Sequence, residues 1–286
     1  MPELPEVETV RRSLDPFVVG RSVNRVILDT PSVWCGAGPD AIAGLTVTRS
    51  ARRGKYLLFF LAPTHAAGTA YWLVVHLRMT GRLTLQDAPE PARKHTHVRI
   101  ELDGETMPPI WLIFQDTRRF GRFSLYPAQS ADQLPAALPR LGPEPLEPSF
   151  GAELLARQLS GHSRLNLKAA LLNQAIVAGI GNIYADEILF ASRLSPQRLA
   201  GSLDDAETAR LADAVRSVLL RAVDLCGTTL KDYVDGWNRK GSFQHCLMVY
   251  GRSGQPCRRC GLAVQKKKLA GRSTHWCPAC QPGLPD

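Results

Sequence analysis

The sequence lacks the features that mark membrane-spanning, secreted and disulfide-stapled proteins. No run of eighteen apolar residues is present, so we expect no transmembrane helix. The N-terminus opens with prolines and glutamates, without the basic and then apolar stretch of a signal peptide, so we predict a cytosolic protein. Seven cysteines in 286 residues do not indicate a disulfide scaffold in that compartment. No internal repeat and no long low-complexity tract is found.

The composition indicates a folded protein with an anionic partner. A hydrophobic content of 44% excludes a disordered chain, and 286 residues are enough for two domains with their own cores. The net charge is +9, which fits a polyanion as partner. A basic surface that serves only solubility is the alternative. Arginines at turns and near the C-terminus favour nucleic acid.

The first eight residues, MPELPEVE, contain the strongest candidates for catalytic groups. Removal of Met1 would leave Pro2 with a secondary amine, which can attack an aldehyde-level carbon and form an iminium ion. An α-amino group has a pKa near ~8, against ~10.4 for lysine, so more of it is unprotonated at neutral pH. Glu3 is a candidate proton donor or shuttle. The alternative is an ordinary helix start, with Pro5 early and acids in the first turn.

The chain after this first helix reads as a series of strands. In some short stretches polar and apolar residues alternate, and in others apolar residues are continuous. Turn signals such as Thr80-Gly81 separate these stretches. Many short strands at close spacing predict a β-sandwich or a barrel. The expected strands are 23–28, 55–61, 72–77, 82–85, 96–102 and 111–114.

The second half of the chain reads as helical. The proline-rich stretch 127–148 predicts a linker, and helical periodicity begins beyond it. The segment Gly179-Ile180-Gly181-Asn182 predicts either a tight helix connection or a phosphate-binding helix start with Asn182 as N-cap. The polar stretch 231–244 predicts a mobile loop. The expected helices are 152–160, 168–178, 183–192 and 204–226.

Four cysteines near the C-terminus predict a metal site. Two Cys-x-x-Cys pairs, separated by sixteen residues, have the spacing of a four-thiolate zinc site. Four thiolates leave no open position on the ion, so we expect one structural zinc rather than a catalytic one. Redox dithiols are the alternative. The expected ligands are Cys257, Cys260, Cys277 and Cys280.

Basic and aromatic side chains elsewhere suit contact with a duplex. Arg272, close before Cys277, is a candidate phosphate ligand at the tip of the finger. His95 and His97 would share one face of a strand, either as a metal pair or, for His95 beside Lys94, as a phosphate contact. An exposed Met or Phe can wedge between bases. For Phe120 the alternative is a place in the core.

These motifs together resemble the formamidopyrimidine-DNA glycosylase family of bacteria. The resemblance rests on PELPEVE, on the segment from Lys168 through Gly179-Ile-Gly-Asn-Ile-Tyr-Ala-Asp-Glu187, and on the four-cysteine finger, and it runs from end to end. It implies an α+β multidomain fold: an N-terminal helix with a β-sandwich, a helix–two-turn–helix domain, and a zinc-finger β-hairpin. The expected boundaries are 1–126 for the catalytic domain, 127–148 for the linker, 149–243 for the helical domain with its lesion loop, and 244–286 for the finger.

The resemblance also implies roles for single residues. Pro2 would be the Schiff-base nucleophile, Glu3 the acid, Lys55 the lysine of β-elimination, and Arg272 the arginine of δ-elimination. The implied DNA contacts are His76, His95, Arg118, Arg164 and Asn182, and the implied gap-filling trio is Met79, Arg118 and Phe120. The sequence departs from the family pattern at Arg78 and Thr117, where glycine and proline are usual.

The function implied is removal of oxidised purines from double-stranded DNA, followed by β,δ-elimination at the abasic site. The alternatives are an endonuclease VIII-like enzyme for oxidised pyrimidines and a zinc-finger DNA-binding protein without catalysis. Leu4 in PELPEVE, rather than a glycine, favours the purine branch. We expect damaged DNA as partner, no membrane, a monomer, and a place in the bacterial cytoplasm at the nucleoid.

Overall fold

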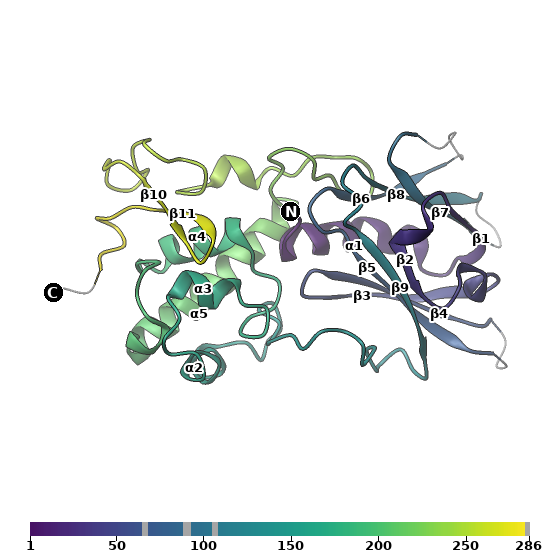
Figure 1. The fold of residues 1–286 in the computed structure, drawn as a ribbon, viewed down its shortest axis with the longest axis horizontal. Helices are drawn as coiled ribbons and strands as arrows, with labels where there is room; N and C mark the ends of the chain where they lie inside the picture. Colours follow the sequence, from purple (N-terminus) through teal and green to yellow (C-terminus); the bar gives the residue numbers. More distant parts are fainter. Residues whose placement is uncertain (65–67, 88–92, 105–107, 284–286) are drawn as a thin grey trace. The chain divides into compact units, whose positions relative to one another are not determined.

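The computed structural model describes residues 1–64, 68–87, 93–104 and 108–283. The chain forms two compact units (Figure 1). The first comprises Met1–Pro139 and Cys226–Ser242, and the second comprises Arg140–Leu225 and Phe243–Asp286. The expected α+β class is confirmed, with a helix and β-sandwich in the first unit and helices with a small hairpin in the second.

The first unit begins with helix α1, Leu4–Val18. Glu3 is its N-cap, and the N–H of Glu3 donates to the Glu6 carboxylate over 2.8 Å, one of the two bonds of a capping box. Val7, Val10 and Leu14 are buried, as their helical spacing predicts. Burial of each such side chain stabilises the fold by roughly 1.5–3 kcal/mol.

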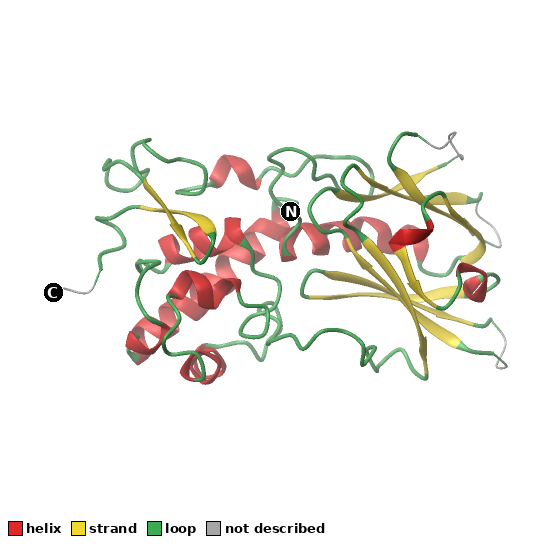
Figure 2. Ribbon diagram, in the orientation of Figure 1, coloured by secondary structure: helices red, strands yellow, loops and turns green. Residues whose placement is uncertain are grey.

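Within the part of the chain that the structure describes, nine strands form one sheet that folds over into two layers (Figure 2). The order is β2-β9-β5-β4-β3-β1-β7-β8-β6, and all neighbours are antiparallel except β2 and β9. In the β1–β3 ladder Ser22 pairs with Thr46, and backbone hydrogen bonds from Gly20 to Val47 and from Val23 to Leu45 extend the contact on either side. The strands are β1 Ser22–Leu28, β2 Trp34–Gly36, β3 Thr46–Arg53, β4 Tyr56–Ala62, β5 Ala70–His76, β6 Gly81–Gln86, β7 Thr96–Asp103, β8 Ile110–Asp116 and β9 Arg122–Ala128.

The apolar run in β4 is buried on both faces. Leu57, Phe59 and Leu61 point into the main core with the apolar face of α1. Leu58 and Phe60 point the other way, into a second cluster with Trp72 and Val74 of β5. A strand between two cores needs apolar residues at successive positions, so polar and apolar residues do not alternate along β4.

The described residues of the second unit, up to 283, form four α-helices and the hairpin. The helices are α2 Ala152–Ser160, α3 Leu167–Leu172, α4 Asn182–Ala191 and α5 Asp205–Asp224, and the strands are β10 Gln265–Leu269 and β11 Arg272–Trp276. A capping box between Asp204 and Glu207 starts α5. Short 3-10 helices occur at Pro31–Val33, Pro39–Ile42, Ala200–Ser202 and Phe243–Cys246. No helix or strand lies between residues 129 and 151.

Several sequence-based boundaries were wrong. The predicted helix 168–178 ends at Leu172, because the side chain of Asn173 accepts the N–H of Ala175 over 3.0 Å and turns the chain. Strands β2, β3 and β9 were not predicted. Strand β3, with Arg49, Arg52 and Arg53, carries too few apolar residues to show a strand pattern.

Among the described residues, no helix combines the length and the apolar character that a bilayer crossing requires.

Candidate active site

Pro2 and Glu3 lie buried at the start of α1. Met1 precedes them and is half exposed, and with Met1 in place the Pro2 nitrogen belongs to an amide. Glu3 is only 2% exposed. A buried carboxyl in the residue that follows Pro2 is a candidate for proton transfer to or from a reacting group.

Glu6 fixes this first turn, a role that the sequence did not reveal. One oxygen of its carboxylate accepts the N–H of Glu3 over 2.8 Å. The other accepts the N–H of Thr228 over 2.7 Å, although the two residues are 222 positions apart. Glu6 therefore joins the start of α1 to a distant loop of the same unit.

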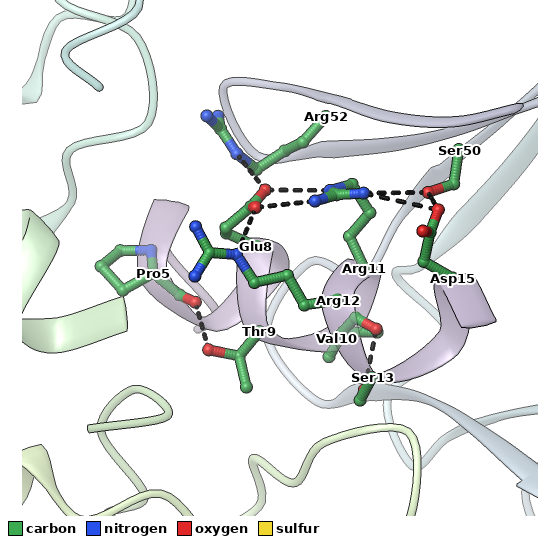
Figure 3. Close-up of polar contacts among 10 residues, drawn as sticks. All are labelled: Pro5, Glu8, Thr9, Val10, Arg11, Arg12, Ser13, Asp15, Ser50 and Arg52. Carbon is green, nitrogen blue, oxygen red and sulfur yellow. Dashed lines mark hydrogen bonds and ion pairs between the residues drawn. The ribbon is translucent and has the colours of Figure 1, made fainter. Parts of the chain in front are cut away.

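Glu8 gathers three arginines around one buried carboxylate (Figure 3). Its oxygens accept hydrogen bonds from Arg11, Arg12 and Arg52, with N–O distances of 2.8 to 3.3 Å. Burial raises the pKa of Glu8, but the hydrogen bonds and charges of these arginines outweigh burial, and the net pKa lies below the ordinary value. Glu8 is therefore ionised and holds the cationic cluster in place.

Arg52 connects this cluster to the turn that carries Lys55. The guanidinium of Arg52 donates to Glu8 and, through Nη1, to the carbonyl of Gly54 over 2.9 Å. Lys55 follows in the β3–β4 turn and is buried. Gly54 has a φ of 56°, a conformation that glycine adopts without strain. Helix α1 and the Lys55 turn are thus tied by a buried ion pair.

His76 ends strand β5 as a buried, neutral imidazole. Its Nδ1 accepts the backbone N–H of Arg78 over 2.9 Å, so its proton is on Nε2. Burial, followed by the positive charges of Arg78 and Lys55, lowers the pKa of His76 from 6.5 to about 3. The ring of Tyr56 packs edge-on against it, with centroids 4.6 Å apart. A neutral Nε2–H is a fixed donor for a phosphate oxygen.

Met79 and Phe120 are exposed, as a role in wedging bases requires. Their exposed fractions are 41% and 50%, and the guanidinium carbon of Arg118 lies 5.4 Å from the centre of the Phe120 ring. The alternative of a core position for Phe120 is wrong.

Asp116 joins the two loops that carry this trio, a role that was not predicted. Its carboxylate accepts the Thr80 hydroxyl from one loop. From the other loop it accepts the N–H of Arg118 over 3.1 Å and of Gly121 over 2.8 Å. Asp116 ends β8 and pairs with Gly81, the first residue of β6, so both loops leave the same end of the sheet.

His95 and His97 do not form a metal pair. His97 is a buried core residue whose ring bonds the Thr30 hydroxyl over 2.9 Å and the Asp116 carbonyl over 2.7 Å. His95 precedes the irregular register at the start of β7, with a φ of 73°. It is half buried, and its carbonyl accepts the N–H of Asp116 over 3.0 Å.

In the second unit, Arg164 and Arg272 are exposed and Asn182 is half buried. Arg164 lies in the turn between α2 and α3. Arg272 begins β11 directly after Ala270 and Gly271, whose φ values of 47° and 73° make the tight hairpin turn.

The prediction of Asn182 as an N-cap was wrong, because Gly181 is the N-cap of α4. The Asn182 side-chain amide instead donates to the carbonyl of Ser273 over 2.9 Å. Asn182 thus links the first turn of α4 to the finger hairpin within the second unit.

Two buried acids on α4 hold the finger region. Asp186 accepts Lys168 Nζ over 2.6 Å, and its second oxygen accepts both the N–H and the ring Nδ1 of His275, at 2.9 and 3.0 Å. Lys168 and Asp186 have no exposed side-chain surface. Glu187 accepts three successive backbone N–H groups, those of residues 248 to 250. Burial raises the pKa of Glu187 despite these bonds.

The four predicted cysteine ligands converge. Their Sγ atoms all lie within 4.8 Å of one another, with 3.9 Å between Cys257 and Cys280 and 3.4 Å between Cys260 and Cys277. Zinc–sulfur bonds of 2.3 Å in a tetrahedron give a sulfur–sulfur distance of about 3.8 Å. The four thiolates therefore fit a single structural zinc ion.

Family models match three consecutive parts of the chain. A formamidopyrimidine-DNA glycosylase N-terminal domain matches residues 1–123, the H2TH domain of the same glycosylases matches 141–234, and a zinc finger found in FPG and IleRS matches 254–283.

Full-length relatives and solved structures agree with these matches. The formamidopyrimidine-DNA glycosylase of Symbiobacterium thermophilum is 47% identical over 99% of this chain and 90% of its own length. That of Heliobacterium modesticaldum is 46% identical over 98% and 100%. The MutM (Fpg) protein of Thermus thermophilus has a TM-score of 0.83 at 43% identity, over 99% and 100%. Lactococcus lactis Fpg, in complex with DNA that contains an abasic site, has a TM-score of 0.85 at 34% identity, over 98% and 100%.

Proposed function

Because this chain belongs to the formamidopyrimidine-DNA glycosylase family, we propose that it removes oxidised purines from duplex DNA and then cleaves the strand at the abasic site. The enzyme is a base-excision-repair glycosylase with lyase activity, and its partner is damaged double-stranded DNA. The observation that carries the chemistry is the buried Pro2-Glu3 pair at the first turn of α1.

Pro2 and Glu3 carry the first steps of the proposed reaction. Once Met1 is removed, the Pro2 amine attacks C1′ of the damaged nucleotide. The bond from C1′ to the base breaks, and the base leaves with a proton while Glu3 assists the opening of the sugar. The nitrogen of Pro2 is then joined to C1′ as an iminium ion, which withdraws electrons from the sugar.

Lys55 and Arg272 carry the proposed strand cleavage. Loss of a proton from C2′ expels the 3′ phosphate, and a second elimination expels the 5′ phosphate. Lys55 assists the first elimination, supported by its buried place in a turn tied to α1 through Arg52. Arg272 assists the second, supported by its exposed guanidinium at the hairpin tip.

The remaining predicted residues bind and shape the duplex in this proposal. His76, His95, Arg118, Arg164 and Asn182 contact the DNA. Met79, Arg118 and Phe120 fill the space that the flipped nucleotide leaves, and flipping costs a few kcal/mol that is smallest at a damaged pair. The zinc ion shapes the finger and takes no part in bond breaking. We place the enzyme in the bacterial cytoplasm, at the nucleoid.

The proposed nucleophile is tested with sodium borohydride, which reduces an iminium to a stable protein–DNA adduct. With a duplex that contains 8-oxoguanine, the wild-type chain should give an adduct and a nicked strand, and its intact mass should lack Met1. Pro2→Gly should lose most of the adduct, because its primary amine is a different nucleophile. Glu3→Gln should fail to release the damaged base.

An unchanged adduct yield in Pro2→Gly would show that the adduct does not depend on the secondary amine of Pro2, and the site of attachment in that adduct would then decide between the N-terminal amine of the introduced glycine and a lysine. Faster cleavage of a thymine glycol duplex than of an 8-oxoguanine duplex would assign the enzyme to oxidised pyrimidines. Binding without any scission would leave a DNA-binding protein that lacks catalysis.

A further inference from the structure

The segment 226–242, called the 226–242 loop below, belongs to the first unit although it follows α5. The sequence predicted a mobile polar loop over 231–244. In the structure residues 233–236 are buried, whereas residues 238–240 are exposed. The loop therefore has a fixed centre and an exposed tip.

The backbone of Gly236 seats the centre of the loop on α1 and β6. Its N–H donates to the Ser13 hydroxyl over 2.9 Å, and its carbonyl accepts the N–H of Leu85 over 2.8 Å. A Cβ at this position would lie 2.6 Å from a methyl group of Leu14, so a side chain does not fit. The backbone approaches the helix closely because residue 236 is glycine.

Trp237 adds an aromatic contact to this seat. Its ring packs edge-on against Phe17, in the last turn of α1, with ring centroids 4.8 Å apart and planes at 79°. The Trp237 side chain also packs against the main core of the unit. An edge-to-face pair stabilises beyond the apolar area that it buries.

Asp235 connects the buried centre of the loop, residues 233–236, to its exposed tip, residues 238–240. One carboxylate oxygen accepts the N–H groups of Trp237 and Arg239, at 2.8 and 2.9 Å, and the other accepts Arg239 Nε over 2.9 Å. Asn238 lies between them with a φ of 61°, which asparagine tolerates better than most residues. The shape of the exposed tip is therefore set from the buried centre.

Thr229 braces the two arms of the loop. Its hydroxyl donates to the carbonyl of Tyr233 and accepts the N–H of Gly241, each over 3.0 Å. The segment before the buried centre, at Thr229, thus contacts the segment after it, at Gly241. These two hydrogen bonds, together with the contacts of Gly236 to α1 and β6, limit the movement of residues 229–233 relative to residue 241.

We propose that Trp237 is a positioning residue for recognition of the damaged base. By packing against Phe17 it holds the centre of the 226–242 loop in place before DNA arrives, so that only the tip and the arms order around the flipped base. Preorganisation of this kind strengthens binding because less freedom is lost on association. The inference rests on the proposed function and on the lesion loop that the family resemblance implies for this part of the chain.

The test compares base removal with cleavage at a site where no base is present. The variants are Trp237→Ala, Phe17→Ala, the double variant and Trp237→Phe. Leu134→Ala is the matched control, because Leu134 belongs to the same unit, lies outside the loop and is about as exposed as Phe17, at 39% against 40%. Single-turnover rates are measured on an 8-oxoguanine duplex and on a duplex with a preformed abasic site, and amide hydrogen exchange is measured on the free chain.

Both alanine variants should speed hydrogen exchange across residues 228–242 and slow removal of 8-oxoguanine by roughly three- to tenfold, the effect of one aromatic pair. Cleavage of the abasic duplex should stay within about twofold of wild type, because it needs no base recognition. The double variant should be no slower than either single variant. Trp237→Phe should restore most of the rate.

Unchanged hydrogen exchange in the alanine variants would overturn the anchoring role alone. An equal fall of both activities would reduce Trp237 to a residue that only stabilises the fold. Faster exchange with an unchanged rate of base removal would show that the anchor has no part in recognition. A wild-type chain that removes no oxidised purine would overturn the proposed function, and this inference with it.

Discussion

At the scale of a single residue, the neutral imidazole of His76 makes the folded chain less stable in acid. Burial and the charges of Arg78 and Lys55 lower the pKa of His76 from 6.5 to about 3. An unfolded chain binds a proton at His76 near pH 6.5, whereas the folded chain does not until about pH 3. The unfolded state therefore gains protons first, and stability falls as the pH drops from 6.5 towards 3.

Replacement of His76 by glutamine should remove this part of the acid sensitivity. Between pH 7 and pH 5 the wild-type chain should lose about 2 kcal/mol more stability than His76→Gln. Urea unfolding of the N-terminal unit at both pH values measures the difference. Equal losses in the two proteins would mean that the folded imidazole accepts a proton as readily as the unfolded one.

The sequence reveals single residues whose chemistry is local. The four cysteines stand out because their residue type and short spacing have few other uses, whereas the Pro2-Glu3 start taken alone also fits an ordinary helix start and gains its role from the family resemblance. Asp116 and Glu6 do not stand out, since their partners at Thr80 and Thr228 are distant in the chain. An isolated acid in a sequence gives no sign of which N–H groups it will meet.

At the scale of elements, the Glu8–Arg52 ion pair sets the position of the Lys55 turn against α1. Arg52→Met removes the bonds to Glu8 and to the Gly54 carbonyl, and should slow cleavage of a preformed abasic site by about tenfold, equivalent to ~1.4 kcal/mol. Arg12→Met is the matched control, because Arg12 also bonds Glu8 but has no bond to the turn among the described residues.

Arg12→Met should therefore cleave within about twofold of wild type. Removal of 8-oxoguanine should change less than cleavage in Arg52→Met, since Pro2 and Glu3 lie at the other end of the link. Equal slowing in Arg52→Met and Arg12→Met would show that the charge of the cluster matters and not the link to Lys55. Thermal unfolding of both variants checks that each chain is folded.

The elements that the sequence predicts best are those with strong periodicity or strong caps. The stripe of α1 and the buried run of β4 were recognisable, because burial on one helix face or on both strand faces leaves a clear pattern. Strand β3 was missed because its arginines serve Glu8 and other partners in place of an alternating apolar face. The end of α3 depends on one side-chain bond of Asn173, which periodicity does not show.

At the scale of the whole molecule, the shift from strand to helix patterns near the proline-rich stretch indicated more than one part. The sequence placed the 226–242 loop with the helical part, whereas its residues pack with the N-terminal unit. That packing depends on contacts such as Gly236 with Ser13, which join positions 223 residues apart. No local pattern encodes them, so the domain boundaries drawn from the sequence remain a proposal.

The finger depends on its metal, because the apolar cluster beneath it is small. That cluster is built from Phe190, Val249, Cys257, Val264 and Cys277, and two of its five members are themselves zinc ligands. Structural zinc contributes about 10–16 kcal/mol of apparent binding free energy in small fingers. Without zinc, the β10–β11 hairpin that presents Arg272 should therefore unfold.

Removal of zinc should abolish the second elimination, which Arg272 assists, while the first unit stays folded. A strong chelator should release one zinc ion per chain, speed hydrogen exchange across residues 254–283, and leave exchange in the β-sandwich unchanged. Cys260→Ser should behave like the chelated chain, and Cys246→Ser, outside the thiolate cluster, should retain metal and activity. The hydrogen bonds of Glu187 to residues 248–250 require no metal, so that segment should stay protected in the chelated chain. Loss of protection there as well would mean that zinc, and not the buried acids of α4, organises the whole C-terminal region.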